Sequence, residues 1–218
     1  MQLKGGSMRA EREKTLGLVQ VALFAAVIII MAFTPFLGYI PLGFTRATII
    51  HIPVILGSIL LGPKKGAILG GVFGLTSFIN NTLNPTVTSF VFTPFYTMGE
   101  IHGGLGSIVI CFLPRILVGV FPFFVYKLFN WILQKKHNGS TYALGVAGLV
   151  GSLTNTLLVM HLIFLFFKDS YAAANGIATE SVYAFILSII GMNGVPEAII
   201  AAVIVAFVGR VLLKVRKM

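Results

Sequence analysis

Charged and polar side chains inside apolar stretches are the residues of this sequence that could do chemistry. Arg115 and Glu197 each lie within a long apolar run, and Arg46 begins the apolar stretch that contains His51. The other polar side chains of this kind are Asn80, Asn81, Asn155 and Asn193. A charged side chain at the centre of a membrane helix costs about 2.5–3.5 kcal/mol, so these residues are candidates for a function. Polar groups that converge from several helices predict a pocket for a polar solute.

Each of these residues also has a purely structural interpretation. Arg115 and Glu197 would form an ion pair that joins two helices, and Arg46 would extend its charge to the membrane surface. His51 and His161 would be hydrogen-bonded packing residues, and the asparagines would hydrogen-bond between helices. The prediction of a pocket therefore depends on the whole set and not on any single residue.

An enzyme is a different class of function, and the sequence gives little support for it. An intramembrane hydrolase needs a nucleophile and a base at one depth, and the nearest pair is Ser152 with His161. These two residues lie nine positions apart and on different helical turns, so they are poorly aligned. The single cysteine, Cys111, and the four histidines show no metal-ligand spacing. We therefore predict no catalytic residue and no metal site.

The composition indicates that membrane helices position these residues. The chain has 218 residues, of which 57% are hydrophobic and 10% charged, and its mean hydropathy is +0.97. Soluble domains carry about 25% charged residues. The net charge of +10 is spread over the ends of apolar segments, which excludes a nucleic-acid-binding face and favours contacts with anionic lipids.

Six apolar segments predict an all-α integral membrane protein, a bundle of six transmembrane helices. The segments are 15–37, 46–62, 66–80, 105–133, 142–167 and 182–213. Residues 81–104 are rich in Pro, Thr and Gly and predict a long structured outer loop between helices 3 and 4. Residues 8–218 form the single predicted domain, and residues 1–7, which precede Met8, are interpreted as a remnant left by cloning.

The distribution of basic residues predicts the orientation of the bundle. If the N-terminus is inside, 13 of the 16 basic residues face the cytoplasm, and only Arg46, Arg115 and Lys168 do not. Both termini are therefore predicted to be cytoplasmic, with the Lys64–Lys65 turn inside. The polar side chains named above then lie at outer or middle depth, so the predicted pocket opens outward.

The first apolar segment carries small residues at helical spacing. Ala22, Ala25, Ala26 and Ala32 form a stripe, and the spacing of Ala22 and Ala26 allows another helix to approach closely. The stripe is explained either by packing within this protein or by docking to a separate membrane subunit.

These features together resemble the substrate-binding S component of an energy-coupling factor (ECF) vitamin transporter. The resemblance covers nearly all of residues 12–215 and includes the hairpin IPVILGSILLGPKKGAILG. Three segments are most similar to the pantothenate-specific group: IPLGFTRATIIHIPVILGSILLGPKKG, GLTSFINNTLNPTVTSFVF and CFLPRILVGVFPFFVYK. Members of other groups use the same scaffold for folate, riboflavin, cobalamin, thiamine or pyridoxine, and a membrane scaffold without a ligand is the remaining alternative.

The resemblance implies a bacterial cell-membrane protein that captures a vitamin from outside and delivers it by toppling. It implies a transmembrane coupling subunit of the EcfT type, docked at Ala22, Ala25 and Ala26, and two ATP-binding-cassette ATPases. The sequence lacks the phosphate-binding motif GxxxxGK[ST], so ATP is a cofactor of the partners and none is expected in this chain.

Pantothenate is a small anion with hydroxyl groups and an amide. Its carboxylate would bind a guanidinium, and we expect Arg115 to be the deeper anchor unless Glu197 neutralises it, in which case Arg46 takes the role. The asparagines would bind the hydroxyls and the amide. Four aromatic residues of the outer loop would form a lid that excludes water: Phe90, Phe92, Phe95 and Tyr96.

Overall fold

The computed structural model describes residues 3–34, 37–42 and 45–217, with side chains described within 11–34, 37–38 and 48–215. The chain is mainly helical. The α-helices are α1 (Leu3–Phe33), α2 (His51–Leu61), α3 (Pro63–Leu83), α4 (Leu105–Val118), α5 (Phe121–Ile132), α6 (Gly139–Asn175), α7 (Val182–Ile189) and α8 (Val195–Lys217). Three short turns of other helix types are η1 (Ser89–Val91), η2 (Thr179–Ser181) and the π-helix η3 (Ile190–Gly194).

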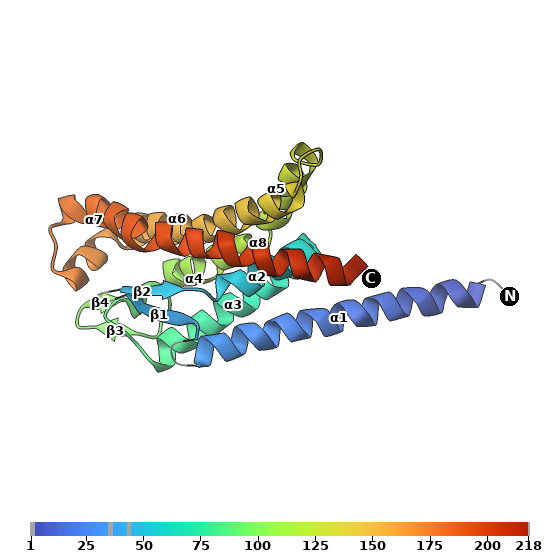
Figure 1. Ribbon diagram of the computed structural model, residues 1–218. Helices are drawn as coiled ribbons and strands as arrows, with labels where there is room; N and C mark the ends of the chain where they lie inside the picture. Colours follow the sequence, from blue (N-terminus) through green and yellow to red (C-terminus); the bar gives the residue numbers. More distant parts are fainter. Residues whose placement is uncertain (1–2, 35–36, 43–44, 218) are drawn as a thin grey trace.

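Two small antiparallel hairpins complete the described structure. The first pairs β1 (Tyr39–Leu42) with β2 (Thr45–Thr48), and the second pairs β3 (Thr97–Met98) with β4 (Ile101–His102). Both hairpins gather at one end of the molecule beside α7, and both termini point toward the other end (Figure 1). We call the hairpin end the outer end and the end with the termini the inner end, following the predicted orientation.

Four helical stretches are long and apolar enough to cross a membrane. They are Glu11–Phe33, Leu105–Ile132, Gly139–Asn175 and Thr179–Val215. The second stretch contains α4 and α5, and the fourth contains α7, η3 and α8. The apolar helix α2 is shorter, at 11 residues, and it is enclosed by the other helices, because every residue from His51 to Leu60 is buried.

The structure corrects two predicted boundaries. The segment 46–62 was predicted to be helical throughout, but residues 45–48 form β2 and the helix begins at His51. Threonine is β-branched and favours strands, whereas Pro53 fits the first turn of a helix. The segment 105–133 is divided between Val118 and Phe121, because Pro122 follows and is tolerated best at the start of a new helix.

Glycines allow α3 to cross α4 at very short range. Gly66, Gly70 and Gly74 recur every four residues and share one face of α3. A Cβ atom added at Gly66 would overlap the carbonyl oxygen of Gly119, and one at Gly70 would overlap the backbone of Arg115. The glycine row therefore fixes the depth in the bundle at which the Arg115 side chain projects from α4.

The buried apolar side chains form two clusters, one toward each end. The inner cluster surrounds α2 and includes Val118 of α4, Ala147 of α6 and Ala201 of α8. The outer cluster draws on η1, α4, α6 and α7 and includes Ile110 and Val159. Between the two clusters lie residues 111–117 of α4 and residues 148–158 of α6. These two segments carry several of the polar side chains described next.

Candidate functional site

Arg115 lies between the two apolar clusters and is 6% exposed. Its Nη1 atom donates a hydrogen bond to the carbonyl of Ile110 at 2.7 Å. Pro114 explains why that carbonyl is available, since proline has no N–H to bond the carbonyl four residues earlier in the helix. Nη2 also lies 3.5 Å from the hydroxyl of Ser77 on α3. The guanidinium is thus turned along α4 toward the outer end.

Two aromatic rings enclose the same guanidinium. Its Cζ atom lies 5.0 Å from the ring centroid of Phe92, which follows η1, and 5.5 Å from that of Phe73 on α3. Phe92 is half-buried and Phe73 is buried. Aromatic faces attract a cation and keep water away from it, which strengthens the interaction of the guanidinium with an anion.

Glu197 is also buried, at 6% exposed, but its contact is with the first hairpin. Its Oε1 atom accepts a hydrogen bond from the backbone N–H of Thr48 at 2.6 Å. The described side chains of Arg115 and Glu197 form no ion pair with each other. The carboxylate therefore connects the start of α8 to the end of β2.

Polar side chains of α2 and α6 lie at a common depth. Gly151 of α6 packs against Ile55 of α2, and the two helices run in opposite directions. Asn155 on α6 and His51 on α2 each lie one helical turn from this contact, toward the outer end. Both are buried, as is Ser152 beside Gly151.

The backbones of Arg115 and Glu197 lie at nearly the same depth in the bundle as Asn155 and Ser152 of α6. Gly106 of α4 packs against Phe166 of α6, and Pro122 of α5 packs against Gly151, so Arg115 falls opposite residues 155–158. On the other side of α6, Gly194 meets Thr156 and Gly148 meets Ala201, which places Glu197 opposite Ser152. We call Arg115, Glu197, His51, Ser152 and Asn155 the polar layer.

Several atoms of the polar layer have no hydrogen-bond partner among the described residues. They are both ring nitrogens of His51, the hydroxyl of Ser152 and Oδ1 of Asn155. Leaving a buried polar group unsatisfied costs about 1–3 kcal/mol, so most such groups bind a partner, water or a ligand. The polar layer is therefore a place where a polar ligand would be stabilised.

Asn80 and Asn81, predicted as a pair of ligand contacts, have different surroundings. Asn81 donates to the carbonyl of Ser77 at 2.9 Å and accepts from the hydroxyl of Ser89 at 2.8 Å. It thus ties η1 to α3 and holds the segment that carries Phe92. Asn80 accepts from the side chain of Asn84 at 3.1 Å, at an exposed place beside the end of α3.

The predicted aromatic lid is only partly assembled around the guanidinium. Phe92 contacts Arg115, whereas Phe90 is fully buried in the outer cluster and Phe95 is 73% exposed. Tyr96 is half-buried and packs against the outer cluster.

The π-helix η3 enters the site beside α6 and was not foreseen from the sequence. It carries Asn193, which is half-buried, and ends at Gly194 against Thr156. A π-turn inserts one residue into a helix and often marks a functional site. The glycines Gly191 and Gly194 before Pro196 are the only sequence signal for it.

The remaining candidate residues lie elsewhere. His161 is exposed, with Nδ1 2.7 Å from the carbonyl oxygen of Leu157, while Ser152 is buried, so the two do not form a catalytic pair. Arg46 belongs to β2, and its side chain falls outside the part that the structure describes.

The alanine stripe of α1 faces two ways. Ala32 is 5% exposed and belongs to the inner cluster, and Ala25 is half-buried against the same cluster. Ala22 and Ala26 are exposed. Packing within the protein therefore accounts for half of the stripe, and the pair at four-residue spacing is free to meet another surface.

Comparisons with known proteins agree on one family. The sequence profile described as "ECF transporter, substrate-specific component" matches residues 17–209. The "Pantothenic acid transporter PanT" of Lactococcus lactis subsp. cremoris (strain MG1363) is 37% identical over 200 residues, covering 88% of this chain and 97% of the relative. The "Pantothenate transporter PanT" of Leuconostoc mesenteroides subsp. mesenteroides is 31% identical over 208 residues, covering 93% and 94%.

One solved structure is also similar. It is described as the S-component for biotin from an ECF-type ABC transporter, with a TM-score of 0.45 and 22% sequence identity. The match covers 95% of this chain and 94% of that structure.

Proposed function

Because this chain belongs to the family of substrate-specific components of ECF transporters, we propose that it captures pantothenate outside the cell. It is a multi-pass protein of the cell membrane. The two curated relatives that it matches along nearly their whole length are both named as transporters of this vitamin. In this proposal the predicted six spans, with both termini cytoplasmic, place the polar layer within reach of the outer surface.

The observation that carries the proposal is the buried guanidinium of Arg115 at the level of unsatisfied polar atoms. Phe73 and Phe92 enclose it, and it is turned toward the outer end. A guanidinium binds a carboxylate through two parallel hydrogen bonds, most strongly where water is excluded. His51 and Asn155 then supply hydrogen bonds for the hydroxyls and the amide, as Asn193 does from η3.

Two further residues act by positioning. Glu197 holds β2 through the Thr48 amide, so it fixes the hairpin that carries Arg46. Asn81 holds η1 and with it Phe92. Neither needs to contact the vitamin to affect its binding.

Isothermal calorimetry on the purified chain tests the proposed ligand. Pantothenate is expected to bind at least about 100-fold more tightly than biotin, riboflavin, folate, thiamine or pyridoxine. A difference of this size needs about 2.7 kcal/mol, which one matched carboxylate–guanidinium pair can supply against riboflavin, thiamine and pyridoxine, because these vitamins lack a carboxylate. Biotin and folate carry carboxylates too, so the preference over them depends on the hydrogen bonds that the polar layer offers to the hydroxyls and the amide of pantothenate. Tighter binding of another vitamin would contradict the assignment to pantothenate, and so would the absence of binding to any of these vitamins.

Replacing Asn81 with leucine is expected to weaken pantothenate binding by about tenfold. The change breaks the hydrogen bond from Ser89 and frees η1, so the Phe92 ring no longer covers Arg115, and one lost buried hydrogen bond has about this effect. Asn80→Leu is the matched control, because that side chain bonds only the exposed Asn84 among the described residues. Equal affinities of the two variants, measured by calorimetry, would show that η1 is held by other contacts.

We propose that uptake requires the partners of the family: a membrane coupling subunit and two ATP-binding-cassette ATPases, which hydrolyse ATP. The exposed pair Ala22 and Ala26 supports docking of the coupling subunit along α1. Large exposed apolar side chains flank the pair, among them Leu23 at 66% and Val19 at 60%.

A further inference from the structure

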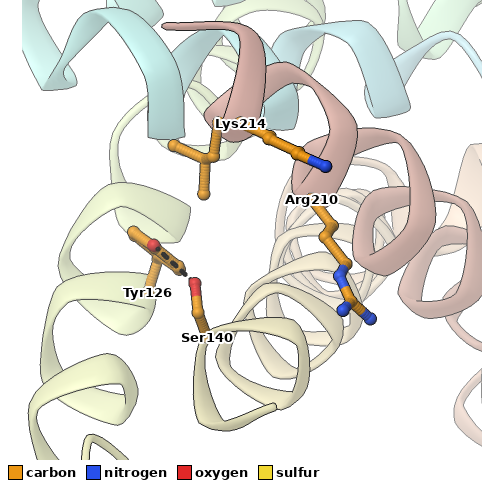
Figure 2. Close-up of a pocket in the computed structure, with 5 residues that line it drawn as sticks. Tyr126, Ser140, Arg210 and Lys214 are labelled. Carbon is orange, nitrogen blue, oxygen red and sulfur yellow. Dashed lines mark hydrogen bonds between the residues drawn. The ribbon is translucent and has the colours of Figure 1, made fainter. Parts of the chain in front are cut away.

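A separate pocket lies at the inner end of the bundle, far from the polar layer. It has a volume of about 280 Å³ and is lined by Tyr126 of α5, Ser140 of α6, and Arg210, Leu213 and Lys214 of α8. Figure 2 shows the two hydroxyl-bearing side chains on one side of the opening and the two basic side chains of α8 on the other. Three helices thus contribute polar groups to one hollow that vitamin capture does not use.

The side chains of the pocket match the chemistry of a phosphate group. The hydroxyls of Tyr126 and Ser140 lie 3.1 Å apart, and each can turn its proton toward an anion. Arg210 and Lys214 are four residues apart on one face of α8, and both are exposed. In the part of the chain whose side chains are described, no carboxylate forms an ion pair with either of them.

The surroundings of the pocket point to a lipid and not to a soluble phosphate. Trp131 and Tyr142 are 67% and 60% exposed near the ends of α5 and α6, where aromatic side chains mark the membrane–water interface. On α8, Phe207 is 69% exposed one turn before Arg210, toward the middle of the helix, and Val211, directly after Arg210, is 61% exposed. A headgroup in the pocket would therefore have an apolar face for its acyl chain next to it.

We propose that this pocket binds the phosphate of an anionic phospholipid from the inner leaflet of the membrane. The guanidinium and the ammonium group neutralise the phosphate, and the Tyr126 and Ser140 hydroxyls donate hydrogen bonds to its oxygens. The lipid joins the inner ends of α5, α6 and α8. This inference does not depend on which vitamin the outer site binds.

Native mass spectrometry of the chain released from nanodiscs tests the proposal. The nanodiscs contain phosphatidylcholine with a minor share of phosphatidylglycerol, and the retained phosphatidylglycerol is measured. The double variant Arg210→Gln/Lys214→Gln is expected to retain about 30-fold less, the factor that follows from losing two direct contacts with the phosphate at about 1 kcal/mol each. Tyr126→Phe, which keeps the ring, is expected to retain about fivefold less.

The matched control is Arg12→Gln/Lys14→Gln on α1. This variant also removes two positive charges from the inner end of the protein, but at exposed positions away from the pocket. The retained phosphatidylglycerol is therefore expected to stay within about twofold of the parent. Equal losses in the two double variants would overturn the proposal in favour of a general surface charge. Displacement of the lipid by inorganic phosphate would overturn it in favour of a soluble ligand.

Discussion

Replacing Arg115 with alanine is expected to weaken pantothenate binding by about 100- to 4,000-fold. Arg115 is 6% exposed and its guanidinium is enclosed by Phe73 and Phe92, so the carboxylate of the vitamin would lose its charged partner in a place where water cannot replace it. Removing one member of a buried charge pair costs about 3–5 kcal/mol, and each 1.4 kcal/mol is a factor of about ten in affinity. Calorimetry on the purified variant measures the loss.

A second ligand separates this effect from damage to the fold. Panthenol has an alcohol where pantothenate has the carboxylate, and the parent protein is expected to prefer pantothenate strongly. In Arg115→Ala the preference should disappear, because only the charged ligand loses an interaction. A variant that is merely misfolded would lose affinity for both ligands in the same proportion and would keep the preference. Thermal unfolding of the variant without ligand provides a further check on its stability.

Arg46 is the competing anchor, and the same pair of ligands decides between the two arginines. If the preference for the carboxylate survives in Arg115→Ala and disappears in Arg46→Ala, the anchor is Arg46. Arg115→Lys is informative as well, because a lysine keeps the charge but cannot form two parallel hydrogen bonds. It is expected to regain only part of the lost affinity.

The sequence identified the fold class and several buried polar residues because both leave a strong local signal. An apolar run of membrane length can be recognised without any contact being known, and a charge within it is conspicuous, as for Arg115 and Glu197. The pair Pro114–Arg115 even contains the reason for the direction of the guanidinium, since proline leaves the Ile110 carbonyl available to it.

Contacts between distant segments left no such signal. The bond between Glu197 and the Thr48 amide joins residues 149 positions apart, and nothing in either segment indicates the other. Ser77 and Phe73 were missed because serine and phenylalanine are ordinary residues of a membrane helix, and only the crossing of α3 and α4 brings them to Arg115. Four residues of the polar layer (Arg115, Glu197, His51 and Asn155) were therefore named from the sequence, whereas Ser152 was not among the predicted binding residues and the geometry of the layer could not be predicted.

The row of glycines on α3 leads to the second large effect. Replacing Gly70 with valine is expected to lower the thermal unfolding temperature by roughly 2–12 °C and to weaken pantothenate binding as well. A side chain at this position would overlap the backbone of Arg115 and Ile116, which cannot move aside as a flexible side chain would. Overpacking costs about 1–3 kcal/mol, and each kcal/mol shifts the unfolding temperature of a protein of this size by about 2–4 °C.

Gly71→Val is the matched control, since a Cβ atom at Gly71 meets nothing within 4 Å. The two variants make the same substitution in the same helix, with the same change in helix propensity. They differ only in the neighbouring atoms that the new side chain would meet. Unfolding is followed by the fluorescence of Trp131, and binding by calorimetry at a temperature where both variants are folded. Only Gly70→Val should lose affinity, because α4 must move away from α3 and carry the Arg115 guanidinium with it. Equal behaviour of the two variants would show that α3 and α4 are not held together at the glycine row, and the position assigned to Arg115 would then be wrong.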